Sequence, residues 1–215
     1  MSDSGCGLVR HTRGTFVSPR GPALRTHVWQ AKEATAQQAN NACELFILHG
    51  YGAHGAFPTV RILAEHLAAR GFTCRSLDFE GCGESEGLPG LINDYADLVT
   101  DALAFIEAQR VVTEKPAFIL GTSAGGALAL ICSTVAPPAT FAGAVLLSPM
   151  VVISEAAKPG ALAQRALRVL GALAPARTAA LPPHLPNLTA SAPTRASPRR
   201  RAGHAVGGAH RRLFG

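Results

Sequence analysis

Residues 117–135 read AFILGTSAGGALALICSTV, and this stretch decides the fold. Four apolar residues, 117–120, have the composition of a buried strand, and the run stops at Gly121. Small and apolar residues from 124 to 135 then predict a tightly packed helix. A strand that passes into a helix through so short a turn is typical of proteins in which strands and helices alternate. We therefore expect Ser123 to lie at a sharp bend between the two elements.

The chain on either side of this stretch repeats the alternation. The short apolar runs, the 3–4 spacing of apolar residues and the turn residues predict these elements: a hairpin at 14–29, strands at 44–48, 73–79, 117–120 and 143–147, and helices at 57–70, 92–110 and 124–135. Residues 34–42 are expected to form a loop. Strands that alternate with helices in short units predict a doubly wound α/β fold with a mostly parallel sheet.

Ser123 is the candidate nucleophile. It lies in Gly121-Thr122-Ser123-Ala124-Gly125, a G-x-S-x-G string that has little weight alone in a glycine-rich chain. The strand before it and the helix after it supply the context of a nucleophile elbow, in which the flanking glycines leave the hydroxyl free. The first-turn amides of that helix would also face developing negative charge. The alternative is an ordinary turn with a serine that caps the helix.

His49-Gly50-Tyr51-Gly52 follows the strand at 44–48 and is the second signal. An oxyanion hole needs two converging amides, one after the nucleophile and one from a loop after an earlier strand. The amides of Ala124 and Tyr51 are therefore the candidate pair. The alternative is that these residues form only a turn.

Four motifs, in this order and spacing, resemble the monoacylglycerol lipase-like (serine aminopeptidase-type) family of α/β-hydrolases. They are residues 49–52, the helix end LAARGF, residues 77–87 (LDFEGCGESEG) and residues 121–126. A later piece, 147–159, resembles the segment where that family leaves its sheet and enters the cap. The resemblance runs from about Ser18 to about Leu181. It implies a serine hydrolase of carboxylic esters, such as monoacylglycerols or other acyl lipids.

The chain departs from this family at two positions. Ala124 stands where the family usually has Met, so the pocket wall loses bulk while the amide is kept. Cys82 stands where the family usually has His, and no base beside it in the sequence would activate its thiol.

The triad acid and base are not found in the sequence. The family order is Ser, then Asp or Glu, then His. After Ser123 the only acidic residue is Glu155, which the resemblance places at the cap entrance. No strand-like run precedes the later histidines, which are His184, His204 and His210. His49 and His54 are alternative bases that the resemblance makes scaffold residues, and Asp78 is interpreted as a turn-former.

The charge of the chain is divided unevenly. Residues 156–215 hold 10 basic and no acidic residues, whereas the first 155 hold 10 basic and 14 acidic residues. Residues 184–215 are mostly Ala, Arg, Gly and Pro and are interpreted as disordered. The expected organisation is a flexible N-terminus (1–13), a partial hydrolase core (14–155), the start of a cap (156–183) and a basic tail (184–215). Truncation, alternative splicing or a frame shift would produce such a chain.

Other classes of site have little support. The five cysteines are never spaced as metal ligands, and neither a cofactor nor a metal is expected. The absence of a long apolar run or a signal peptide predicts a cytoplasmic protein, with an option of peripheral membrane contact. We expect an ester substrate and no specific nucleic acid, and at most a weak contact of the Arg-rich tail with an anionic surface. Two readings stay open beside the esterase: a non-catalytic remnant of the fold, and a function that resides in the tail.

Overall fold

The computed structural model describes residues 8–33, 35, 43–110, 115–152, 160–162, 165 and 169. The chain divides into two compact units, Met1–Leu181 and Pro182–Gly215, and every described residue lies in the first. The expected basic tail and most of the expected cap lie outside the described residues, as does most of the expected loop at 34–42.

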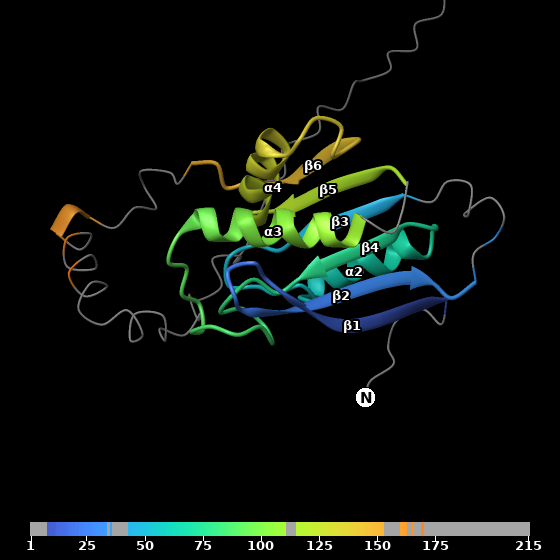
Figure 1. Ribbon diagram of the computed structural model, residues 1–215, viewed down its shortest axis with the longest axis horizontal. Helices are drawn as coiled ribbons and strands as arrows, with labels where there is room; N and C mark the ends of the chain where they lie inside the picture. Colours follow the sequence, from blue (N-terminus) through green and yellow to red (C-terminus); the bar gives the residue numbers. More distant parts are fainter. Residues whose placement is uncertain are drawn as a thin grey trace, which may run out of the picture. The chain divides into compact units, whose positions relative to one another are not determined.

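The described part of the chain contains one mixed, mostly parallel sheet of six strands, in the order β1-β2-β4-β3-β5-β6 (Figure 1). Its strands are β1 (Val9–Val17), β2 (Ala23–Ala31), β3 (Glu44–Leu48), β4 (Thr73–Leu77), β5 (Ala117–Thr122) and β6 (Gly143–Leu147). The last four are parallel to one another, and the β1–β2 hairpin adds to β4 in antiparallel fashion. The α/β prediction is thereby confirmed.

The hairpin is longer than the sequence indicated. β1 begins at Val9, which pairs with Ala31, so the expected flexible N-terminus is wrong for residues 9–13. These five residues are mostly polar and exposed, and they lack the apolar alternation of a half-buried strand. The ladder to β2 orders them, together with the ring of His11, which stacks on buried Trp29 at a centroid distance of 4.5 Å.

Helices cover both faces of the sheet. They are α2 (Pro58–Ala68), α3 (Tyr95–Arg110) and α4 (Ala124–Val135). Side chains of β3 alternate between the faces: Phe46 and Leu48 pack in the cluster with α3 and α4, whereas Leu45 and Ile47 pack in the cluster with α2. This alternation explains why β3 is buried along its whole length and reads as a continuous apolar run.

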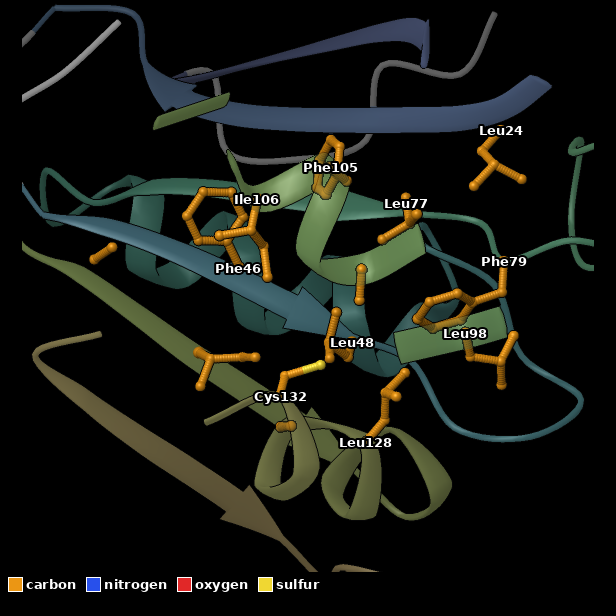
Figure 2. Close-up of a cluster of buried hydrophobic side chains, with 14 residues drawn as sticks. Leu24, Phe46, Leu48, Leu77, Phe79, Leu98, Phe105, Ile106, Leu128 and Cys132 are labelled. Carbon is orange, nitrogen blue, oxygen red and sulfur yellow. The ribbon is translucent and has the colours of Figure 1, made fainter. Parts of the chain in front are cut away.

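The larger cluster lies between the sheet and the helices α3 and α4 (Figure 2). Phe105 of α3 makes edge-to-face contacts with Phe46 and with Phe16 of the hairpin. Leu128 and Cys132 line the side of α4 that faces this core. The helix that follows Ser123 is therefore fixed against the sheet by the main core of the molecule.

Other element boundaries also differ from the expectations, and α2 spans Pro58–Ala68 instead of 57–70. α3 begins at Tyr95 instead of residue 92, because the Asp94 carboxylate accepts the Ala96 amide at 2.9 Å as an N-cap does. β4 ends at Leu77 instead of Phe79, since the Phe79 amide donates to the His49 ring. β5 continues to Thr122, where it still pairs with β6.

Candidate active site

Ser123 lies at the bend between β5 and α4, and its side chain is exposed. Its backbone has φ 54° and ψ −120°, and residues with a side chain seldom adopt such a positive φ. The hydroxyl makes no capping hydrogen bond to α4, which argues against the capping alternative. The end of β6 holds the bend, because the Ser123 amide donates to the Leu147 carbonyl at 3.0 Å and the Ser123 carbonyl accepts from Met150 at 2.9 Å.

The glycines around Ser123 are required by close backbone approach. A Cβ at Gly121 would lie 2.0 Å from the Gly125 carbonyl oxygen. A Cβ at Gly125 would lie 2.2 Å from the Leu48 carbonyl oxygen and 2.4 Å from that of His49. All three distances are far below van der Waals contact, so only glycine lets α4 start this close to β3 and β5.

The loop after β3 lies directly beside Ser123. A Cβ at Gly50 would be 3.2 Å from the Ser123 Cβ and 3.7 Å from its hydroxyl oxygen. Tyr51 follows Gly50 and is 68% exposed. The amide of Ala124 belongs to the first turn of α4, where N–H groups have no partner inside the helix. The structure thus brings together the two loops that carry the candidate amides.

A small pocket, open to solvent, adjoins this bend. Residues from the loop after β3, the turn after β4, α3 and α4 line it: His49, Gly50, Tyr51, Phe79, Glu80, Cys82, Ile92, Tyr95, Leu98, Ala124 and Leu128. The lining is mainly apolar and includes both residues whose amides are the candidate oxyanion donors. A pocket of this kind suits an apolar group next to Ser123.

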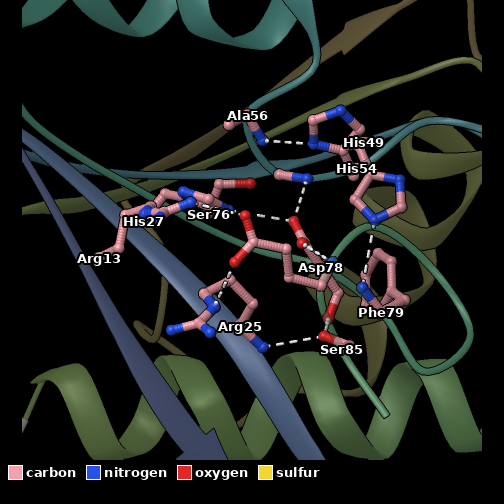
Figure 3. Close-up of polar contacts among 12 residues, drawn as sticks. Arg13, Arg25, His27, His49, His54, Ala56, Ser76, Asp78, Phe79 and Ser85 are labelled. Atoms are coloured by element: carbon pink, nitrogen blue, oxygen red, sulfur yellow. Dashed lines mark hydrogen bonds and ion pairs between the residues drawn. The ribbon is translucent and has the colours of Figure 1, made fainter. Parts of the chain in front are cut away.

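Asp78 organises the backbone around the pocket (Figure 3). Its Oδ1 accepts the Gly55 amide at 2.6 Å and lies 3.1 Å from His27 Nε2, while its Oδ2 accepts the Glu84 amide at 2.8 Å. Burial by itself raises the pKa of Asp78, but the hydrogen bonds from His27 and the two amides more than offset it and lower the pKa below 3.8. Its contacts are those of an anchor for two turns.

His49 and His54 are engaged by backbone groups. His49 is 3% exposed, its Nε2 accepts the Phe79 amide at 3.2 Å, and its Nδ1 lies 2.9 Å from the Gly50 carbonyl. Burial lowers the pKa of His49 to about 4, so its ring is neutral near pH 7. His54 accepts the Ala56 amide at 3.3 Å through Nδ1. These contacts occupy both ring nitrogens of His49 and the Nδ1 of His54.

Cys82 is in the pocket wall as a protonated thiol. Burial, with a smaller effect of the Asp78 charge, raises its pKa to about 11. A thiol with such a pKa is a poor nucleophile at neutral pH, in accord with a packing role.

Among the described residues, no histidine or carboxylate side chain makes a hydrogen bond with the Ser123 hydroxyl. Glu155, His184, His204 and His210 all lie outside the described residues. In the described ranges no group of three or more His, Cys, Asp or Glu side chains is arranged to hold a metal ion. Nor does any helix there have the length and apolar character to cross a membrane.

Comparison with known families agrees with this geometry. The family model described as serine aminopeptidase, S33, matches residues 39–210, which is most of the chain. The chain belongs to this family of α/β-hydrolases. The expected resemblance is confirmed, although the S33 match begins later than Ser18 and extends beyond Leu181 into the segment interpreted as a tail.

Curated proteins similar to this chain include a lipase and an esterase. Human monoglyceride lipase is 34% identical over 109 residues, which are 50% of this chain and 35% of that protein. Caffeoylshikimate esterase of Arabidopsis thaliana is 27% identical over 154 residues, which are 70% of this chain and 44% of that protein. The chain therefore spans about a third of the length of the monoglyceride lipases it matches.

Solved structures show the same fold at low sequence identity. A hypothetical protein of Pseudomonas aeruginosa superposes with a TM-score of 0.62 at 20% identity, covering 78% of this chain and 53% of that one. The α/β-hydrolase GrgF of Penicillium gives a TM-score of 0.58 at 16% identity, covering 76% of this chain and 67% of that one.

Proposed function

We propose that this chain is a serine hydrolase of carboxylic esters, with monoacylglycerols or other acyl-lipid esters as substrates. Ser123 is the nucleophile, and the amides of Tyr51 and Ala124 form the oxyanion hole. The observation that carries the proposal is the strained, exposed Ser123 beside Gly50 at the edge of an apolar pocket. Ser148 also has a positive φ (46°), but the pocket is lined by Ala124, the neighbour of Ser123, and not by Leu147 or Pro149, the neighbours of Ser148.

In the proposed reaction Ser123 Oγ attacks the acyl carbon, and the carbonyl oxygen becomes an anion that the two amides stabilise. The C–O bond to the alcohol then breaks, and the alcohol leaves with a proton. Water attacks the acyl-enzyme, releases the carboxylic acid and restores the serine hydroxyl. We infer that the base that accepts the Ser123 proton comes from outside the described residues, because no described histidine makes a hydrogen bond with the Ser123 hydroxyl.

An alkyl fluorophosphonate probe tests the proposal. We expect the probe to label the purified chain, and labelling to be lost in Ser123→Ala. Ser133→Ala is the matched control, since its hydroxyl donates to the Leu130 carbonyl, one helix turn back in α4. Labelling that survives in Ser123→Ala, or that is lost equally in Ser133→Ala, would refute the assignment of the nucleophile.

A second candidate function is that of a non-catalytic binding module. The observation in its favour is that no described histidine or carboxylate bonds to the Ser123 hydroxyl. A serine without its base retains only the help of the oxyanion hole and of binding, and loses several powers of ten in kcat. A chain that is folded by circular dichroism and yet unlabelled would favour this candidate.

A further inference from the structure

Tyr95, the first residue of α3, joins that helix to the beginning of α4. Its phenol lines the pocket, and its hydroxyl donates a 2.8 Å hydrogen bond to the Ala124 carbonyl. Ala124 is in turn the first residue of α4. Nothing in the sequence pattern indicated this contact, which spans 29 residues.

The orientation of Ala124 matters because its amide is one of the two candidate oxyanion donors. Ala124 has only a methyl side chain, so no long side chain anchors it in the pocket wall. The residue before it, Ser123, has a strained backbone that by itself favours relaxation. A hydrogen bond to the Ala124 carbonyl restricts rotation of that residue and so holds the direction of its amide.

The Tyr95 hydroxyl is well suited to this task. Burial, with a smaller effect of Cys132, raises the pKa of Tyr95 above 10, so the phenol stays protonated and can donate at neutral pH. Because the hydroxyl is engaged by Ala124, Tyr95 presents its apolar ring to the pocket.

We propose that Tyr95 is a positioning residue for the oxyanion hole, and that its hydroxyl keeps the Ala124 amide directed at the carbonyl oxygen of the bound ester. This inference rests on the proposed esterase function. It assigns Tyr95 no contact with the reacting atoms, and it places the effect in the bond-forming step and not in substrate binding.

The test is the reaction of Tyr95→Phe with the alkyl fluorophosphonate over a range of probe concentrations. The saturation curve gives a limiting rate constant for bond formation and a concentration for half-maximal rate. We expect the limiting rate constant to fall about three- to tenfold, as for loss of one neutral hydrogen bond, with little change in the half-maximal concentration. Thr100→Val is the matched control, since Thr100 donates to the Ala96 carbonyl in the same helix at 2.9 Å.

Four outcomes would overturn the inference. An unchanged limiting rate constant in Tyr95→Phe, with normal labelling of the unmodified chain, refutes the positioning role of Tyr95 and leaves the proposed esterase function unaffected. An equal loss in Thr100→Val, or a rise in the half-maximal concentration in place of the rate effect, would show a general loosening of α3. Failure of the unmodified, folded chain to label would overturn the proposed function and the inference with it.

Discussion

The structure leaves no room for a methyl group at position 125. Substituting alanine for Gly125 therefore sets a steric cost against the higher helix propensity of alanine. Alanine is favoured over glycine inside a helix by about 1 kcal/mol, so Gly125→Ala would stabilise α4 if the site were open. The carbonyl oxygens of Leu48 and His49 lie 2.2 and 2.4 Å from the added Cβ, and both belong to backbone that cannot move independently of β3. The steric cost should therefore exceed the gain in propensity.

We expect Gly125→Ala to lower the free energy of unfolding by about 1–3 kcal/mol, as overpacking of a core does. Urea unfolding followed by circular dichroism measures the change. Gly160→Ala is the control, because no atom of the described residues lies within 4 Å of its added Cβ. A Gly125→Ala variant more stable than the parent would mean that α4 does not approach β3 this closely.

At the scale of elements, Asp78 connects the end of β4 to two turns, one through the Gly55 amide and one through the Glu84 amide. Its pKa is lower in the folded chain than the ordinary value of 3.8. A carboxyl group with a depressed folded pKa contributes stability above its unfolded pKa, and that contribution is lost as the pH falls through the folded value. The two turns therefore depend on the charge of Asp78 at neutral pH and lose this support in acid.

Asp78→Asn should be less stable than the parent at pH 7 by about 1–3 kcal/mol, because an amide nitrogen would then face a backbone N–H. The difference should shrink as the pH falls below about 4. Urea unfolding at pH 7, 5 and 3.5 checks both parts, with the exposed Glu107→Gln as control. A deficit that stays constant across this range would contradict the charge-dependent role.

The sequence was most informative for short apolar runs that end at a turn containing glycine or proline. β3, α4 and β6 have the expected limits, because such runs leave few alternatives. The start of α3 could have been found from Asp94, a good N-cap residue, but the apolar spacing extended the helix past it. The polar residues of β1 gave no signal, since its order comes from pairing with β2 and from the stacking of His11 on Trp29.

The residues of the candidate site also fall into two groups, those that a linear motif shows and those that only the fold brings together. Ser123, Tyr51 and Ala124 belong to local motifs, and a linear pattern can show them. Tyr95 becomes part of the site only because α3 and α4 start side by side, and the links of Asp78 to Gly55 and His27 likewise join separate segments. Such contacts depend on how helices cross the sheet, and that geometry has no signature in one sequence.

At the scale of the whole molecule, the two edges of the sheet differ in charge. β1 exposes Arg10 and Arg13, and charged side chains hinder edge-to-edge pairing. β6 carries no charge, and within the described part of the chain it pairs only with β5. The exposed apolar residues on and near β6 are Leu130, Ile131, Val135, Val145, Leu147, Met150, Val151 and Val152.

We expect Val145→Lys to reduce self-association, because it places a charge on the uncharged edge strand. Light scattering as a function of protein concentration measures the effect, and Thr12→Lys on the already basic β1 is the control. Equal scattering of Val145→Lys and the parent at all concentrations would show that this edge takes no part in association.

The uncharged edge strand β6 also affects how the proposed esterase activity should be assayed. Long-chain esters are dispersed with surfactants, and surfactant tails adsorb on exposed apolar surface such as Val145 and Val152. A rise in turnover on adding surfactant would then have two sources, better presentation of the ester and dispersal of clustered enzyme. Water-soluble short-chain esters, which need no dispersant, separate the two.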